Sequence, residues 1–165
     1  MKFFEKQFLK KMMFLLLIVF SISKTSAQCP TPVNDATMAN TGSGANPATT
    51  IAPISYIGTV TAGSDETRML VYMNTVNQFN IPSKITAADL PPVTSFGDVV
   101  AYNGKGQQLM TNYNQASSIF FVASNLEPST TYYFYTVKVA RCGTEYTINN
   151  EIVPGNVIAR TTAAG

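Results

Sequence analysis

The stretch from Asn125 to Gly143, NLEPSTTYYFYTVKVARCG, constrains the fold more than any other part of the chain. Leu126, Pro128 and Thr130 stand at alternate positions, and a nearly unbroken run of aromatic and β-branched residues follows them. Such a run is typical of a β-strand, because these side chains pack well on a pleated surface. Proline ahead of the run turns the chain without requiring an amide donor. The stretch therefore predicts a corner that leads into a strand.

From residue 54 onward, short apolar stretches alternate with turn residues, and no window has a sustained helical period. Asn103-Gly104 predicts a tight hairpin turn, because both central residues of a type I′ turn need positive φ. In one predicted strand Met69, Val71 and Met73 share a face. Several short strands at this spacing predict an all-β sandwich or barrel. We expect the strands at residues 54–60, 68–74, 98–106, 117–126, 131–140 and 156–162.

The first 27 residues have the pattern of a secretory signal peptide. Four lysines precede the apolar run MMFLLLIVF, and the small-residue sequence TSA ends just before Gln28. A membrane anchor is the alternative, but an apolar run of nine residues is shorter than the roughly 20 that span a bilayer. A lipid attachment site is disfavoured because Gln28, and not a small residue, precedes Cys29. We therefore expect no membrane span in the mature chain.

Removal of this segment changes the charge of the chain. The full sequence has 11 Lys and Arg and 9 Asp and Glu, a net charge of +2. Five lysines and Glu5 leave with the signal, so six basic and eight acidic residues remain and the net charge becomes −2. The remaining basic residues are scattered, and this argues against a nucleic-acid partner.

The mature chain is expected to consist of two parts. Residues 28–50 are rich in Thr, Asn, Gly, Ala and Pro and predict an extended lead-in. Residues 51–165 predict one β domain. The two cysteines, Cys29 and Cys142, favour a disulfide in an oxidising compartment, with two unpaired thiols as the alternative.

The residues Leu126, Pro128, Thr130, Tyr132 and Phe134 follow the pattern Leu-x-Pro-x-Thr-x-Tyr-x-Phe. This pattern resembles the junction between strands E and F of fibronectin type III domains. The resemblance implies an antiparallel immunoglobulin-like β-sandwich in which Leu126 fills the end of the core. It also implies a tyrosine corner, where the Tyr132 ring is buried and its hydroxyl bonds nearby backbone. Over residues 51–164 the chain is similar to a subgroup of these domains found in secreted multidomain proteins of Bacteroidota.

The chain departs from the family pattern in the expected core. The usual tryptophan of strand B is missing, and Val60 stands in its place. We therefore expect Phe120, Tyr132, Phe134 and the methionines to fill the core.

A second departure concerns the alternation of side chains after Phe134. Continued alternation would turn Thr136 inward and both Val137 and Val139 outward. We expect a β-bulge near Tyr135 and Thr136 to return the two valines to the core.

The sequence offers few residues for catalysis. It contains no histidine, and this excludes Ser-His and Cys-His nucleophiles and histidine metal sites. Most acidic residues fall in predicted turns, where solvated charge is the simplest role. We predict no catalytic residue, no metal site and no cofactor. The acidic residues of the mature chain are Asp35, Asp65, Glu66, Asp89, Asp98, Glu127, Glu145 and Glu151.

The resemblance implies an exported noncatalytic interaction or spacer module, located in the periplasm, at the cell surface or in the medium. Its partner would be a protein or a polysaccharide. The alternative function is a carbohydrate-binding accessory module of a polysaccharide-degrading system. In that case Tyr133 and Tyr135 would be exposed on one face of their strand and would stack on sugar rings, although cross-strand packing is the commoner use of such residues.

Overall fold

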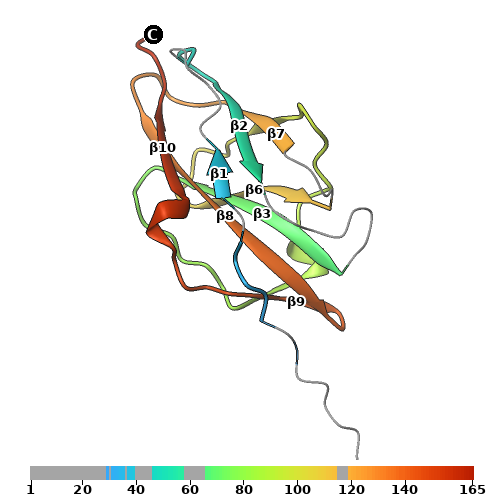
Figure 1. Cartoon of the computed structure of the whole chain (residues 1–165). Helices are drawn as coiled ribbons and strands as arrows, with labels where there is room; N and C mark the ends of the chain where they lie inside the picture. The colour runs from blue at the N-terminus through green and yellow to red at the C-terminus, as the bar shows by residue number, and fades with distance from the viewer. Residues whose placement is uncertain (1–28, 30, 36, 40–45, 58–65, 115–118) are drawn as a thin grey trace, which may run out of the picture.

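The structure is a computed structural model, shown in Figure 1. The described residues form β-strands and two single-turn 3₁₀-helices, with no α-helix among them, and this confirms the all-β prediction. None of the helical turns in the described part of the chain has the length or apolar character needed to cross a membrane. The structure describes residues 29, 31–35, 37–39, 46–57, 66–114 and 119–165.

The described residues form strands and 3₁₀-helices in the following order along the chain. The strands are β1 (Thr37–Ala39), β2 (Ile51–Ile57), β3 (Thr67–Asn74), β4 (Lys84–Thr86), β5 (Val99–Ala101), β6 (Gln108–Tyr113), β7 (Ile119–Ser124), β8 (Thr131–Cys142), β9 (Glu145–Ile148) and β10 (Val157–Thr161). The 3₁₀-helices are η1 (Ala87–Asp89) and η2 (Pro154–Asn156).

The strands form two sheets (Figure 1). The smaller sheet has the order β1-β2-β7-β5, and the larger has the order β4-β9-β8-β3-β6, with β10 also paired to β8. All pairs are antiparallel except β5 with β7, which is parallel. The expectation of a wholly antiparallel fold is therefore wrong at β5. A parallel neighbour arises there because the chain reaches β7 by a crossover connection and not by a hairpin.

The predicted hairpin at Asn103-Gly104 is also wrong. The strands on either side of it, β5 and β6, lie in different sheets. Gly104 and Gly106 have positive φ, but Asn103 does not. The Tyr102 hydroxyl donates to the Gly106 carbonyl at 2.8 Å, and the Asn103 N–H donates to Gln108 Oε1 at 2.7 Å. These bonds stabilise a connection that takes the chain from one sheet to the other.

One core lies between the two sheets; we call it the inner core. Met69, Val71 and Met73 of β3 all face it, and this confirms their predicted common face. Phe121 of β7 is fully buried there, whereas Phe120 is only half-buried. The prediction that Phe120 fills the core is therefore wrong: the neighbouring residue, Phe121, does so, because adjacent residues of a strand point to opposite faces. Val60 lies outside the described residues.

A second core covers the opposite face of the larger sheet; we call it the outer core. Here Tyr135, Val137 and Val139 of β8 pack with Leu70 and Tyr72 of β3. The segments 75–92 and 149–157 cover this face with apolar side chains. The covering side chains are Phe79, Ile81, Ile85, Leu90, Ile152 and Val157.

The outer core removes the need for the bulge expected near Tyr135. Pairing between β3 and β8 continues without a register shift through Val71 and Thr136, so the bulge prediction is wrong. Val137 and Val139 stay on the outer face and are nevertheless fully buried. Both faces of β8 are therefore buried with simple alternation.

A bulge does occur on the other side of β3, in β6. The register shifts by one residue between the pair Val71 with Thr111 and the pair Tyr72 with Leu109. The extra residue, Met110, enters the inner core. As a result Leu109 turns to the outer face, beside Tyr72.

The residues expected to form an extended lead-in are partly built into the fold. Cys29 forms the predicted disulfide with Cys142 at the end of β8. Between the parts of β8 that pair with β10 and β9, the Asn34 side chain forms hydrogen bonds with two backbone groups of β8. Its Nδ2 donates to the Thr136 carbonyl at 3.2 Å, and its Oδ1 accepts from the Lys138 N–H at 3.3 Å. Asn34 therefore replaces a missing strand partner.

Candidate functional site

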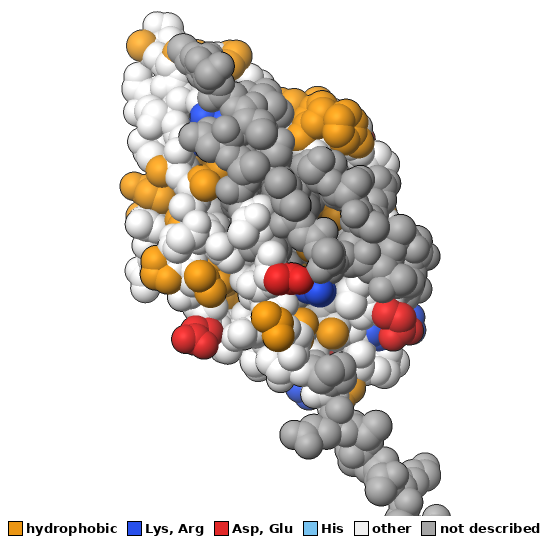
Figure 2. Space-filling model, viewed as in Figure 1, with side chains coloured by type: hydrophobic (Ala, Val, Ile, Leu, Met, Phe, Trp, Pro, Cys, Tyr) orange, Lys and Arg blue, Asp and Glu red, His pale blue; other side chains and the backbone are white. Residues whose placement is uncertain are grey.

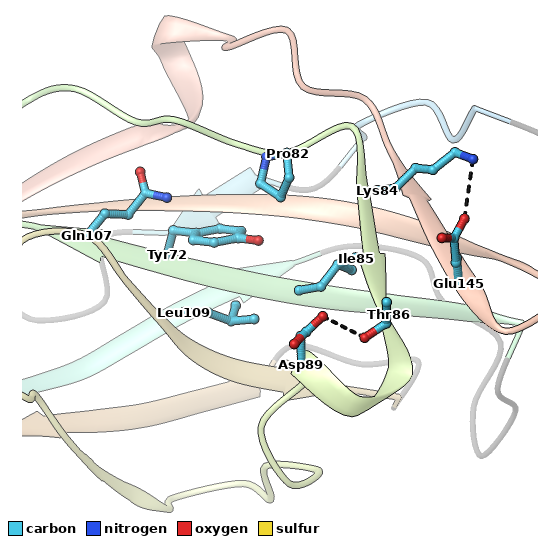
Figure 3. A pocket seen from close by; sticks show the side chains of 9 residues that line it. All are labelled: Tyr72, Pro82, Lys84, Ile85, Thr86, Asp89, Gln107, Leu109 and Glu145. Atoms are coloured by element: carbon cyan, nitrogen blue, oxygen red, sulfur yellow. Dashed lines mark hydrogen bonds and ion pairs between the residues drawn. The ribbon is translucent and has the colours of Figure 1, made fainter.

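A pocket of about 460 Å³ opens on the outer face of the larger sheet (Figure 3). Its size is within the range of small-ligand sites. Four segments contribute to it: β3, the connection that contains β4 and η1, the start of β6, and β9. The lining residues are Tyr72, Pro82, Lys84, Ile85, Thr86, Asp89, Gln107, Leu109 and Glu145.

The floor of this pocket is formed by Tyr72 and Leu109, which are cross-strand partners. Tyr72 is 4% exposed. Its hydroxyl has no hydrogen-bond partner among the residues that the structure describes. Burial raises the pKa of Tyr72 to about 12, because the phenolate would lose its hydration. The pocket thus contains a neutral phenol whose hydrogen-bonding capacity is unused.

The walls of the pocket come from the connection that crosses the outer face. Pro82 and Ile85 stand above and beside the Tyr72 ring (Figure 3). Gln107 holds this connection in place: its Oε1 accepts from the Asn80 N–H at 2.7 Å and its Nε2 donates to the Asn80 carbonyl at 2.9 Å. Since both ends of this amide are occupied, Gln107 acts as a structural wall of the pocket.

The rim carries three charged residues. Lys84 forms an ion pair with Glu145 at 3.2 Å, with both side chains substantially exposed. The Thr86 hydroxyl donates to Asp89 Oδ2 at 2.5 Å. No ion pair to Asp89 occurs within the described part of the chain. The rim therefore has one carboxylate without a neutralising cation, and its two carboxylates bind different partners (Figure 3).

The acidic residues of the described chain do not gather into a metal-binding group. Over the residues that the structure describes, no cluster contains three or more His, Cys, Asp or Glu side chains. Asp65 lies outside those residues. The sequence analysis named Asp89 and Glu145 only as two of the eight acidic residues of the mature chain, and did not place them at one pocket.

The residues of the predicted corner lie at the junction of β7 and β8. Tyr132 has no exposed surface, and its hydroxyl accepts a hydrogen bond from the Glu127 N–H at 2.8 Å. Leu126 and Phe134 both belong to the inner core. The Phe134 ring meets Phe121 edge-on at a centroid distance of 6.5 Å. The corner thus buries the Tyr132 ring and ties its hydroxyl to the Glu127 backbone.

Thr162 closes this corner from the far end of the chain, a role that sequence patterns did not reveal. Its hydroxyl donates to the Glu127 carbonyl at 2.6 Å, and it accepts from the Thr130 N–H at 3.0 Å. The Thr130 hydroxyl in turn donates to the Pro128 carbonyl. The Pro128 residue itself is exposed. Ser129 has a positive φ of 53°, an uncommon conformation that this network holds.

The expected pair of exposed tyrosines is not present. Tyr135 is fully buried in the outer core, so its proposed ligand-binding role is wrong. Its hydroxyl donates to the Glu151 carbonyl at 3.2 Å and accepts from Asn34 Nδ2 at 3.1 Å. Tyr133 is half-buried and lines a smaller hollow of about 310 Å³ with Pro154 and neighbouring residues. Both tyrosines are shielded from solvent because the connections 75–92 and 149–157 cover this face of β8.

A separate apolar surface lies beside the edge strand β5. Val93, Phe96 and Val99 are 46%, 61% and 68% exposed. Phe96 packs edge-on against Phe120 of β7 at a centroid distance of 4.0 Å. Figure 2 shows hydrophobic side chains gathered over the region of β7, while charged side chains are few and scattered on this face. Contiguous apolar surface of this kind is a feature of interaction sites.

Comparisons of the chain with protein-family models, with curated proteins and with solved structures found no significant match. The resemblance to fibronectin type III domains therefore stays a prediction.

Proposed function

We propose that the chain is an exported, noncatalytic interaction or spacer module of the fibronectin type III-like type. The observation that carries this proposal is the order of strands. If β1, β2, β3, β6, β7, β8 and β10 are taken as A, B, C, C′, E, F and G, one sheet has the order A-B-E and the other C′-C-F-G. That partition is the one expected for an immunoglobulin-like sandwich. The Tyr132 corner at the E–F junction gives independent support.

Export is supported by the disulfide and by the pattern of the first 27 residues. The Cys29–Cys142 bond joins positions separated by 113 residues. Bonds of this kind persist in oxidising compartments and are rare in the cytosol. The mature chain would begin close to this bond, so cleavage and oxidation would act on neighbouring parts of the molecule.

An interaction role is supported by two surfaces, the pocket floored by Tyr72 and the apolar surface around Phe96. The carbohydrate-binding alternative has less support, because it required an exposed row of tyrosines and Tyr135 is buried. A large exposed aromatic does occur at Phe96, but it packs against Phe120 and stands away from the tyrosines of β8.

The experiment is mass spectrometry of the protein exported from a Gram-negative host, with and without reductant. We expect a mature chain that begins at Gln28, and a mass that increases by two hydrogens on reduction. Retention of the first 27 residues in the cytoplasmic fraction, or a mass unchanged by reductant, would contradict the export part of the proposal.

The module part is tested separately, by an experimental structure of the exported chain. We expect β3 to lie between β6 and β8, and β2 to lie between β1 and β7. A different partition of strands between the sheets would remove the basis for the module assignment even if export occurs.

A further inference from the structure

The geometry points to the pocket on the outer face as a binding site for a lysine side chain of a partner polypeptide. This inference deepens the proposed interaction role and rests on it for the polypeptide nature of the ligand. Its basis is the combination of an apolar floor, an unused phenol hydroxyl and a carboxylate without a neutralising cation in one pocket.

The charge of the rim selects the sign of the ligand. Lys84 and Glu145 neutralise each other at 3.2 Å, so Asp89 leaves the rim with a net negative charge. An anionic ligand would meet this carboxylate and would have to break the Lys84 ion pair. A cation would instead gain an attractive interaction with Asp89, without disturbing the existing bonds. We therefore assign a cationic group to this part of the pocket.

The hydroxyl of Tyr72 supplies the second polar contact. It is buried without a partner, and an unsatisfied buried polar group costs about 1 to 3 kcal/mol. An ammonium group carries three donors and no acceptor, so it can donate to the carboxylate and, once the side chains over the phenol move aside, to the phenol oxygen, whose exposed surface is below 1 Å². Figure 3 shows the Tyr72 hydroxyl and the Asp89 carboxylate on either side of Ile85, within the same pocket.

The apolar walls account for the stem of the ligand. Leu109, Ile85 and Pro82 offer hydrocarbon surface between the opening and the floor. The four-carbon stem of lysine can lie along such surface while its ammonium reaches polar groups. A sugar fits less well, because Tyr72 is 4% exposed and does not present a ring face for stacking.

The test is an NMR titration of the exported, oxidised protein with three capped peptides. Their sequences are Gly-Lys-Gly, Gly-norleucine-Gly and Gly-acetyllysine-Gly. Norleucine keeps the stem and removes the ammonium, and acetyllysine keeps the stem and removes the charge. We expect the lysine peptide to shift the amide signals of Tyr72, Asp89 and Leu109, and to bind at least fivefold tighter than either analogue.

A fourth probe, n-butylammonium, separates a polypeptide side chain from a free amine. We expect it to shift the same signals with lower affinity than the lysine peptide. Binding of butylammonium as tight as, or tighter than, that of the lysine peptide would overturn the polypeptide assignment.

Two variants and a control locate the contacts. Asp89→Asn keeps the acceptor for the Thr86 hydroxyl and removes the charge, and it should weaken lysine binding about fivefold. Tyr72→Phe removes only the hydroxyl and should weaken binding about tenfold, because a hydrogen bond to a charged group is lost. The matched control is Glu127→Gln, which changes an exposed carboxylate outside the pocket and should leave binding unchanged.

The inference is overturned if the lysine and norleucine peptides bind equally, if Asp89→Asn has no effect, or if the shifted signals lie away from the pocket. The Tyr72→Phe protein should remain folded, since it loses a hydroxyl that has no partner. If the protein does not bind the lysine peptide, the mass and strand-order measurements that test the proposed function are unaffected. Failure of export appears in the mass measurement, and the titration does not test it.

Discussion

The two faces of the larger sheet are both buried, but they are covered in different ways. The inner face packs against a second sheet, and its side chains come from regular strands. The outer face is covered by the connections 75–92 and 149–157 and approached by the N-terminal segment around Asn34. Strand β8 contributes Tyr132 and Phe134 to the inner core and Tyr135, Val137 and Val139 to the outer core. Irregular segments therefore complete the burial of this sheet and also form its pocket.

The covalent link of the N-terminal segment gives the largest expected effect. Replacing both cysteines, Cys29→Ser with Cys142→Ser, removes a bond between positions 113 residues apart. We expect a loss of about 4 to 5 kcal/mol in the free energy of unfolding, because the unfolded chain is no longer constrained. Urea unfolding of the oxidised wild type and the double variant measures it. A loss below about 1 kcal/mol would show that the bond contributes little to the fold.

A matched pair of phenylalanines compares the two cores directly. Phe121→Ala in the inner core should cost about 3 to 5 kcal/mol, since Phe121 is fully buried. Phe79→Ala should cost about 1 to 2 kcal/mol, because Phe79 is only half-buried against Tyr135. Denaturant unfolding of each variant tests the comparison. Equal losses would mean that the covering connections are packed as firmly as the second sheet.

The pH dependence of stability reports on Tyr72 in the outer core. Its pKa is raised to about 12 in the folded chain, while an unfolded tyrosine titrates near pH 10, so burial favours the protonated form. This contribution is fully present below about pH 10 and is lost as the pH rises to about 12, up to roughly 2 to 3 kcal/mol. Between about pH 9 and pH 12, the free energy of unfolding should decline less steeply for Tyr72→Phe than for the wild type. Parallel profiles would contradict this assignment.

The bonds of Asn34 test how the N-terminal segment is attached to β8. Asn34→Leu leaves the Thr136 carbonyl and the Lys138 N–H without this partner, and should cost about 2 kcal/mol. Asn34→Asp keeps an acceptor for the Lys138 N–H and should cost less. Hydrogen exchange of the Lys138 amide, faster in Asn34→Leu than in Asn34→Asp, measures the local effect. Unchanged exchange in both variants would argue against the contact.

The smallest effects compare two hydroxyls on opposite faces of β8. Tyr132→Phe removes one acceptor, for the Glu127 N–H, and should cost about 1 kcal/mol. Tyr135→Phe should cost somewhat more, because its hydroxyl also bonds the Glu151 carbonyl and accepts from Asn34 Nδ2. Thermal unfolding of the two variants gives the order. The reverse order would assign the greater stabilising role to the corner.

Several parts of the fold could be predicted because their signals are local. The common face of Met69, Val71 and Met73 follows from the two-residue period of a strand. The geometry of Tyr132 matches the expectation from its motif, since Leu126 and the bonded Glu127 are close in sequence.

Other parts could not be predicted because they depend on long-range contacts. Short strands such as β4 and β9 contain ordinary polar residues, and their pairing with each other makes them strands. The bulge at Met110 is a mismatch between two strands, so neither strand alone reveals it. The same holds for the parallel position of β5, which the crossover between sheets decides.

The β character of this protein, the inward face of β3 and the residues of the corner are therefore readable from the sequence, since side-chain period and turn chemistry act over a few positions. Burial of the outer face, and the common pocket of Tyr72, Asp89 and Leu109, follow from long-range packing that the sequence pattern does not reveal. The physical reason is that burial is a property of what covers a side chain. In this molecule the cover comes from connections that carry no regular pattern of their own.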